Sequence, residues 1–569
     1  MATQGSTKAS LSEKRDDSPA AHSSPSSDTE LPASKGTDDK VVEKTKYSWR
    51  FWAIFLSLSV TSLLAAVEST VTSTALPIIS ADLNAGELYI WFVNAYFLTS
   101  TAFLPLFGQI ADVFGRRWLT ISIVAIFVLG SGISGGAQNT GMLIAGRAVQ
   151  GIGGGGINLM IDLIVCDLVP LRERGNFMAI IFAIFAVGTS LGPFIGGAIV
   201  QHASWRWVFW INLPIGGVAL ALLFAFLHVK NNSTQTLAKK IGRIDFIGNG
   251  ILITAVTSIL IALTYGGTRF SWSSWRVVLP LVLGFLGIIG FAFFESSNFV
   301  VEPTMPPHLF KNRTAATAYF LTFIHALFSF WVIYFLPVYF QGVLQTSPSR
   351  SGVLLLPTVV TIVPGGLVAG VILSKFGRYK PLHIIGFALM TLGIGLFIKL
   401  DAKSHLAVYV VLQIIAGIGS GLVLTTLLAA IQAALTDKDT ALSTGAWAFV
   451  RSFGTIWGVA IPAAIFNSRS DSLSHRVVDT TARNLVSQGQ AYSHASRDFL
   501  NGLDAVTKGE VISVFSDSLR LVWIVAVVFV GFAFFTVFLE REIKLRVEND
   551  TEFGIKDQPE KPSEHHISV

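Results

Sequence analysis

Long apolar runs separated by short polar segments fill the chain between residues 49 and 540. A membrane-spanning helix needs about 20 mainly apolar residues, and about fourteen runs approach that length. Because the runs are too long for strands, they predict an all-α membrane protein with about 14 transmembrane helices. The runs lie approximately at 50–77, 88–111, 119–137, 142–167, 176–200, 208–229, 245–265, 277–295, 315–340, 351–374, 382–399, 406–435, 442–466 and 519–540.

The two ends of the chain have a different composition. Residues 1–48 and 541–569 are polar and charged, with few large apolar side chains. Such segments cannot bury enough apolar surface to fold, so we expect two disordered tails. The first apolar run starts too late and is too long for a secretory signal peptide.

Basic residues gather in alternate loops between the apolar runs. The positive-inside rule places these loops, and with them both termini, in the cytoplasm. The same rule makes 467–518 an outside loop. The basic loops contain Arg116, Arg117, Arg172, Arg174, Lys230, Lys239, Lys240, Arg243, Lys311, Arg313, Lys375, Arg378 and Lys380.

The sequence repeats itself. GQIADVFGRR begins at Gly108 and GVILSKFGRY begins at Gly370, 262 residues later. GTSLG at Gly188 is echoed by GTIWG at Gly454, 266 residues later. Parallel repeats of this kind occur in transporters, where the substrate site lies between the halves. We therefore predict a tail over 1–48, a six-span half over 49–230, two additional spans with linkers over 231–314, a second six-span half over 315–540 and a tail over 541–569.

Composition and missing motifs exclude several other classes of protein. Hydrophobic residues make up 52% of the chain and charged residues 13%, against about 25% charged residues in soluble domains. The net charge of +6 is modest, and we interpret it as a signal of membrane topology rather than of nucleic-acid binding. The glycines of Gly151–Gly156 match G-x-G-x-x-G, but they lie inside an apolar run rather than after a strand. No phosphate loop or metal-ligand motif occurs, so we expect no cofactor, no metal and no catalytic residues.

Charged residues inside apolar runs are candidate functional residues. An arginine such as Arg147 costs about 2.5–3.5 kcal/mol at the centre of a membrane helix on insertion scales. Glu68 lies deep in the first run, on a polar stripe with Thr61 and Thr72. Burial disfavours the charged form of a carboxyl group, which suits a reversible proton carrier. The alternative is a structural hydrogen bond inside the helix bundle.

The fourth run carries further polar residues on the face of Arg147. These are Asn158 and Asp162, which we interpret as cavity residues. Arg147 and Asp162 are about four helical turns apart, so each needs a partner from another span. His325 and Arg451 are inward-facing candidates in later runs, although Arg451 can instead extend to the membrane surface.

These motifs resemble the major facilitator superfamily, and within it the fourteen-span drug:proton antiporter branch. The loop motif consists of Gly108, Asp112, Gly115, Arg116 and Arg117. The span-4 motif is Leu143-x-x-x-Arg147-x-x-Gln150-Gly151, and the span-5 antiporter motif contains Gly188, Gly192, Pro193, Gly196 and Gly197. The segments Glu68–Pro77 and Trp205–Gly216 also resemble fourteen-span members. The C-terminal half matches mainly by its repeat and span pattern.

The resemblance implies roles for these residues. Asp112 with its arginines is expected to latch one arrangement of the halves, although the cluster can also be a topology signal alone. Arg147 is expected to take part in proton transfer. Pro193 bends its helix, and the surrounding glycines are expected to support antiport, with close packing as the alternative.

We therefore expect a proton-coupled antiporter that exports small hydrophobic or amphiphilic compounds, such as drugs, toxins or secondary metabolites, by alternating access. Its partners are protons, the substrate and the lipid bilayer, and it functions as a monomer. The resemblance to fungal exporters implies the plasma membrane, with the vacuolar membrane as the alternative. A siderophore carrier or another importer is the second interpretation. A membrane enzyme or receptor is a third, but no nucleophile–base set supports an enzyme.

Overall fold

The computed structural model describes residues 47–85, 88, 91–228, 236–267, 270–297, 299–300 and 302–546. The described residues between 48 and 546 belong to one compact unit. The two predicted tails therefore lie outside the described residues, apart from 47–48 and 541–546. Within the described residues the fold is helical, and a single isolated bridge between Gly266 and Phe270 is its only β-structure.

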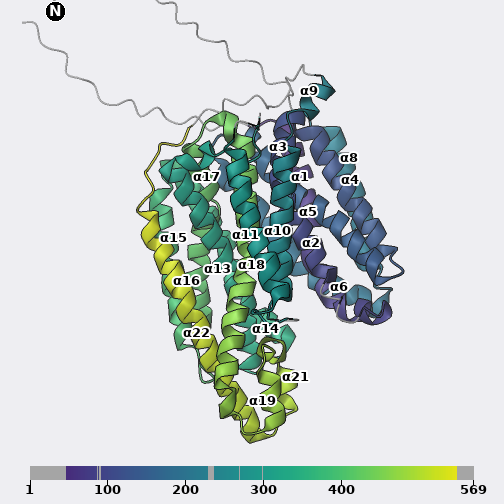
Figure 1. Cartoon of the computed structure of the whole chain (residues 1–569). Helices are drawn as coiled ribbons and strands as arrows, with labels where there is room; N and C mark the ends of the chain where they lie inside the picture. The colour runs from purple at the N-terminus through teal and green to yellow at the C-terminus, as the bar shows by residue number, and fades with distance from the viewer. Residues whose placement is uncertain are drawn as a thin grey trace, which may run out of the picture. The chain divides into compact units, whose positions relative to one another are not determined.

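The first half of the chain forms eight helices (Figure 1). They are α1 (Trp49–Asp82), α2 (Trp91–Ala102), α3 (Leu104–Phe114), α4 (Arg116–Gly135), α5 (Thr140–Leu168), α6 (Arg174–His202), α7 (Trp207–Trp210) and α8 (Asn212–Phe226). The connecting region contains α9 (Leu237–Ile241), α10 (Phe246–Tyr265), α11 (Trp275–Glu295) and α12 (His308–Lys311). We call α1–α8 the N-terminal half and α10–α11 the additional pair.

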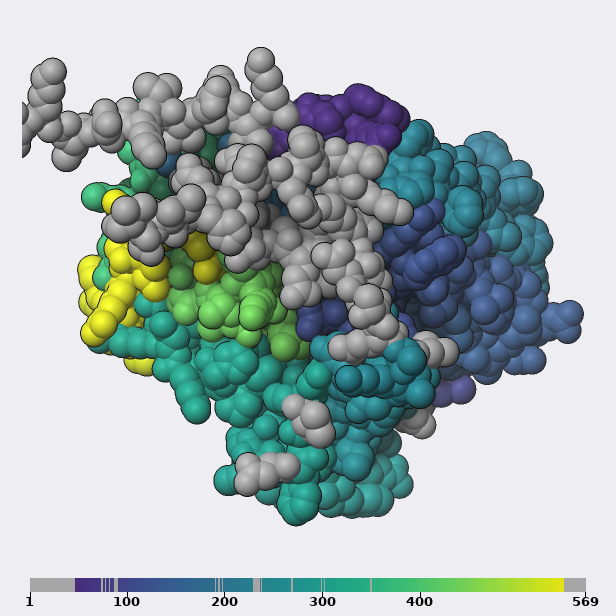
Figure 2. Space-filling view, turned by 90° about the horizontal axis from the view of Figure 1, so that it is seen from above, coloured from purple at the N-terminus to yellow at the C-terminus, as the bar shows by residue number. Residues whose placement is uncertain are grey.

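The C-terminal half follows. It consists of α13 (Arg313–Gly342), α14 (Pro348–Phe376), α15 (Lys380–Leu396), α16 (Leu406–Leu424), α17 (Leu427–Ala433), α18 (Thr440–Leu473), α19 (Thr480–Val486), α20 (Ala491–His494), α21 (Arg497–Asn501) and α22 (Ala505–Val537). Seen from one end of the bundle, the blue N-terminal half and the green and yellow C-terminal half lie beside each other (Figure 2).

The described residues form long apolar helices, but fewer candidate spans than the roughly fourteen that the sequence predicts. Among the described residues, 12 helices are long and apolar enough to cross a membrane, and the bent pair α2–α3 makes a thirteenth. The bend of 44° falls where Pro105 starts α3, because proline has no N–H to continue the helical ladder. α6 covers the fifth predicted run with 29 residues, of which Arg174–Thr189 count as a shorter apolar helix. The structure therefore confirms an all-helical membrane fold with 12 or 13 candidate spans.

The last helix begins earlier than the hydropathy pattern indicates. α22 starts at Ala505, whereas the apolar run begins at residue 519. The side chain of Asp504 accepts hydrogen bonds from the backbone N–H groups of Val506 and Thr507, so a helix forms before the apolar part begins. The range 467–518 thus contains the end of α18, the short helices α19–α21 and the first turns of α22.

The glycine run of α5 sets the packing of the N-terminal half. A Cβ atom added at Gly155 would lie 2.2 Å from the carbonyl oxygen of Ser100 in α2. One added at Gly153 would lie 2.6 Å from the backbone nitrogen of Phe127 in α4. The glycines therefore let α5 contact the backbones of two neighbours at once. This explains the G-x-G-x-x-G pattern without a nucleotide.

The two halves meet along two seams. α6 packs against α14 on one side, and α3 and α5 pack against α18 on the other. The helices of the additional pair pack against each other and contact α2 and α18 (Figure 1). The additional pair therefore lies beside the second seam, which we call the α3–α18 seam.

Candidate functional site

One end of the bundle, which we call the basic end, carries the turns α3–α4, α5–α6 and α14–α15 with their basic residues. Two of these turns are the repeated motif copies. Gly115 has φ 85° in the first copy, and Gly377 has φ 66° in the second. Both values lie in the left-handed region that glycine adopts most readily. The repeated sequence thus ends a helix at a glycine of positive φ in each half, but ψ is 174° at Gly115 and 21° at Gly377, so the two turns differ.

The first glycine of each motif copy contacts the opposite half. A Cβ atom added at Gly108 would lie 3.2 Å from Cα of Gly445 in α18. One added at Gly370 would lie 2.7 Å from the carbonyl carbon of Gly175 in α6. At both points the helices approach closely because neither residue has a side chain. The two halves are therefore in contact at the basic end.

The predicted latch has a different pairing from the one that the sequence indicates. Arg116 donates from Nε to Oδ2 of Asp167 over 2.7 Å, and both side chains are buried. Asp112 lies farther away, with 4.0 Å between its Oδ1 and Nη1 of Arg116. Arg117 does not join the cluster, because it donates to the carbonyl oxygen of Phe224 over 2.9 Å.

Other polar contacts at the basic end cross between the halves. Arg172 donates to the carbonyl oxygens of Ser374 and Lys375 at the end of α14. Arg174 donates to the side-chain carbonyl of Gln432, which α17 positions at the same end. These bonds hold the start of α6 against the C-terminal half.

Glu68 and Arg147 form an ion pair inside the N-terminal half. The two side chains are 0% and 2% exposed, and a guanidinium nitrogen of Arg147 donates to the carboxylate of Glu68. Asn212 in α8 donates to the second carboxylate oxygen. Arg147 also donates to the side chain of Gln150 over 2.7 Å and to the carbonyl oxygen of Phe92 over 2.7 Å. All of these partners belong to the N-terminal half.

Asp162 and Arg451 form an ion pair between the halves. Oδ2 of Asp162 in α5 lies 3.7 Å from Nη2 of Arg451 in α18. Asp162 is 3% exposed, and this oxygen accepts no hydrogen bond within the described part of the chain. The guanidinium carbon of Arg451 lies 4.4 Å from the ring centroid of Trp447 and 5.5 Å from that of Phe182. Among the described residues, this is the ion pair that joins the two halves.

α5 therefore carries three buried charges, each paired with a different helix. Arg147 pairs with α1, Asp162 with α18 and Asp167 with α4. At a rise of about 1.5 Å per residue, Arg147 and Asp162 lie about 22 Å apart along the helix. As expected from the sequence, each of these two residues takes its partner from another span. A displacement of α5 would change all three pairs together.

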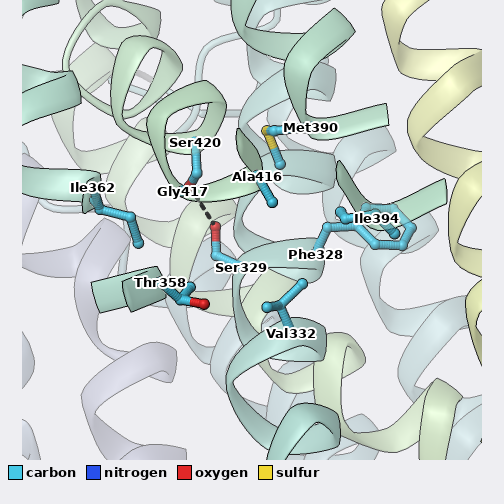
Figure 3. A pocket seen from close by; sticks show the side chains of 10 residues that line it. All are labelled: Phe328, Ser329, Val332, Thr358, Ile362, Met390, Ile394, Ala416, Gly417 and Ser420. Carbon is cyan, nitrogen blue, oxygen red and sulfur yellow. Dashed lines mark hydrogen bonds between the residues drawn. The ribbon is translucent and has the colours of Figure 1, made fainter. Parts of the chain in front are cut away.

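Asn158 and His325 lie apart from these pairs. Asn158 is half-buried and donates to the carbonyl oxygen of Gly154 on its own helix. His325 contacts Oγ of Ser420 over 2.9 Å inside the C-terminal half. Ser420 and Ser329 line a small cavity there (Figure 3), with about 20 Å³ of water-accessible space. That space suits a water molecule and is far too small for an organic substrate.

A larger apolar groove lies on the α6–α14 seam. It has a volume of about 370 Å³, within the range of small-molecule sites. Its walls contain Leu63 of α1, Ile180 and Val187 of α6, and Leu367 of α14, so both halves contribute to it. The described side chains of this groove contribute no polar surface. Its chemistry therefore suits an apolar molecule.

The span-5 motif packs α6 against α1 within the N-terminal half. A Cβ atom at Gly188 would lie 2.7 Å from Cβ of Ala66, and one at Gly192 would lie 2.0 Å from Oγ1 of Thr70. Gly196 is buried in α6. Pro193 and Gly197 are also part of α6, but their side-chain environment lies outside the described residues.

Sequence reasoning missed several partners of the charged residues. Asn212 lies in the segment Trp205–Gly216, where a polar residue in an apolar stretch was the available signal. Asp167, the buried partner of Arg116, lies near the end of its apolar run and is 3% exposed. No group of three or more His, Cys, Asp or Glu side chains among the described residues could hold a metal ion.

Comparison with known proteins gives concordant results. A sequence model of the Major Facilitator Superfamily matches residues 58–459. The chain is 49% identical over 547 residues to the MFS-type transporter gkaD of Penicillium citrinum, covering 96% of this chain and 92% of that protein. It is 46% identical over 534 residues to the efflux pump FUS6 of Gibberella moniliformis, covering 94% of each. The crystal structure of the human organic anion transporter MFSD10 (TETRAN) matches with a TM-score of 0.54 at 14% identity, covering 85% of this chain and 100% of that chain.

Proposed function

Because the chain belongs to the major facilitator superfamily and is therefore a transporter rather than an enzyme, we propose that it exports small secondary metabolites in exchange for protons. Its similarity to a pump named for efflux extends over nearly its whole length, which supports export over import. The substrates are hydrophobic or amphiphilic, and alternating access moves them across the membrane.

The ion pairs of α5 are the observation that carries this proposal. Glu68 takes up and releases the proton, because burial favours its neutral form while the neighbouring Arg147 favours its carboxylate. Asp162 transmits the change, because its partner Arg451 belongs to the other half. A shift of α5 on protonation of Glu68 would move Asp162 relative to Arg451 and so weaken the contact between the halves. One helix thus links proton binding to rocking.

The apolar groove supports the choice of substrate. It lies between the halves at Leu63, Val187 and Leu367, so rocking would change its shape. A wall without polar surface binds apolar molecules by burying their surface rather than by specific hydrogen bonds. Substitution of Val187 by Trp is therefore expected to lower export of the largest substrates first.

We further propose fourteen spans in the plasma membrane, with both termini and the basic end in the cytoplasm. α6 supplies the fourteenth span, since the helix itself has 29 residues. The basic residues at this end support the orientation. In this orientation, the contacts between the halves at the basic end correspond to a state closed toward the cytoplasm.

The test compares accumulation of apolar compounds in cells that lack or express the protein. Expression should lower accumulation, and a protonophore should abolish that effect. Export that survives the protonophore but stops on ATP depletion would contradict proton coupling. Uptake of a siderophore on expression would favour the importer interpretation.

A second experiment tests the proton carrier with purified protein in liposomes. Glu68→Gln should lose transport driven by a pH gradient but retain exchange down a substrate gradient, because only the proton site is altered. The exposed Asp498→Asn should behave like the unmodified protein in both assays. Full proton-driven export by Glu68→Gln would move the role of proton carrier to Asp162.

A further inference from the structure

The additional pair is attached to the N-terminal half at two levels. At the end opposite the basic end, Trp91 of α2 donates from Nε1 to the hydroxyl of Tyr265 over 2.7 Å. Next to it, Nδ2 of Asn94 lies 3.3 Å from Oγ1 of Thr264. At the basic end the attachment depends on Gln109 in α3, a residue without an assigned role in the motif that begins at Gly108.

Gln109 has five hydrogen bonds to the region that contains the additional pair. Its amide nitrogen donates to the carbonyl oxygens of Glu302 over 2.7 Å and Arg243 over 3.4 Å. Its carbonyl oxygen accepts from the backbone N–H of Asp245, Nδ2 of Asn249 and Oγ1 of Thr304, over 3.2, 3.1 and 3.0 Å. The side chain is buried, and all donors and acceptors of its amide are used.

The partners of Gln109 are also bonded to one another. Nδ2 of Asn249 donates to Oγ1 of Thr304 over 2.6 Å. The carboxylate of Glu295, at the end of α11, accepts from the backbone N–H groups of Thr304 and Met305 over 3.2 and 3.3 Å. These bonds join the start of α10, the end of α11 and the segment that follows into one socket for Gln109.

The contact of the additional pair with the C-terminal half is of another kind. Phe285 of α11 meets Trp457 of α18 with 5.9 Å between the ring centroids. Gly108, the neighbour of Gln109, faces Gly445 of the same helix α18. The aromatic contact between Phe285 and Trp457 has no directional hydrogen bond, so the additional pair can slide over α18. The socket of Gln109 cannot slide without leaving buried polar groups unpaired.

We propose that Gln109 is a positioning residue that fixes the additional pair to the N-terminal half. The pair then moves with that half, slides over α18 during rocking and forms a side wall along the α3–α18 seam. This inference rests on the alternating access of the proposed function. It gives the two additional spans a mechanical role in transport.

Cross-linking tests the proposal in a Cys166→Ser background, since Cys166 is the sole cysteine. The sliding pair is Phe285→Cys with Trp457→Cys, and the fixed pair is Asn94→Cys with Thr264→Cys. A short bifunctional thiol reagent is applied to liposomes with and without a pH gradient. The yield of the sliding pair should change severalfold with the gradient, and its cross-link should block transport. The fixed pair should give a constant yield, and its cross-link should permit transport.

Asn176→Cys with Ser374→Cys reports rocking itself, because this polar contact crosses between the halves over 3.3 Å. If the cross-link yield of this pair responds to the gradient while that of the sliding pair does not, the proposed side wall is contradicted and the antiport function stands. If neither pair responds, proton coupling is contradicted. The variant Gln109→Leu then tests by itself whether Gln109 fixes the additional pair to the N-terminal half.

Gln109→Leu keeps the size of the side chain but removes its five hydrogen bonds. It should lower the cross-link yield of the sliding pair severalfold without a gradient, and slow transport by about tenfold to a hundredfold through misplacement of α3. Gln201→Leu, at an exposed position of α6, is the matched control. An unchanged yield in Gln109→Leu overturns the proposal.

Discussion

The two copies of the repeated motif each end a helix at a glycine of positive φ, but their side chains have different partners. In the copy at α3–α4, Arg116 points into its own half and pairs with Asp167. In the copy at α14–α15, the carbonyl oxygens of Ser374 and Lys375 accept hydrogen bonds from Arg172 of the other half. The position of Asp112 in the first copy is taken by Ser374 in the second.

The difference indicates that the two copies have different structural roles. The first copy stabilises the N-terminal half and places Gln109 for the additional pair. The second copy holds the basic end closed, because its polar contacts cross between the halves. Both copies thus have the glycine of positive φ and the glycine contact, while the charged and polar contacts around each copy differ.

Loss of Arg116 should have the largest effect on stability. Arg116→Ala leaves Asp167 buried without its main partner, and breaking a buried ion pair costs about 3–5 kcal/mol. Thermal unfolding in detergent should show a large drop in the midpoint temperature. The corresponding Arg378 of the second copy is exposed, so Arg378→Ala should change stability by less than about 0.5 kcal/mol. Equal losses in the two variants would remove the distinction between the copies.

Enlarging the glycine contacts should have the next largest effect. Gly370→Ala places a methyl group 2.6 Å from Oδ1 of Asn176, whereas Gly108→Ala places one 3.2 Å from Cα of Gly445. Overpacking of this kind costs about 1–3 kcal/mol, so Gly370→Ala should open the basic end more than Gly108→Ala does. The cross-link between residues 176 and 374 cannot be used here, because Asn176 itself contacts the substituted position. Fluorescence quenching between labels at exposed positions of the two halves should instead measure the separation of the halves at the basic end. A larger effect of Gly108→Ala would reverse the assignment of the closing role.

Removal of Arg172 should have a smaller effect. Arg172→Ala deletes two hydrogen bonds to α14 at a partly exposed site, and we expect a loss of about 1 kcal/mol from the closed state. The variant should shift the population toward the state open at the basic end, with little change in unfolding temperature. Lys311→Ala, another exposed basic residue at this end, serves as the control.

Asp112→Asn should have the smallest effect on stability. Its carboxylate is 31% exposed and lies 4.0 Å from Arg116, so the pair contributes less than about 1 kcal/mol. We nevertheless expect transport to fall strongly, with insertion and expression near normal, because the acidic group lies beside the moving α3–α18 seam. Transport at the unmodified rate would reduce this cluster to a topology signal.

The pattern of apolar runs was sufficient to predict the helical membrane fold, because each span is determined by local hydropathy. The ends of helices were harder to predict, as α22 shows, since Asp504 starts the helix before the apolar stretch. The contacts between side chains of different helices were harder to predict than the helix ends. Glu68 and Arg147 were both identified as candidates, but their contact joins residues 79 apart in the chain. The five bonds of Gln109 reach residues at least 134 positions away, which no local pattern records.

The sole thiol of the chain is positioned to record these motions. Cys166 is buried in α5, and its sulfur lies 3.5 Å from the side-chain nitrogen of Gln432 in α17. Because the two residues belong to opposite halves, separation of the basic end would unshield the sulfur. The rate at which a maleimide alkylates Cys166 in the unmodified protein therefore reports how often the basic end opens. Addition of substrate or a change of pH should raise or lower this rate.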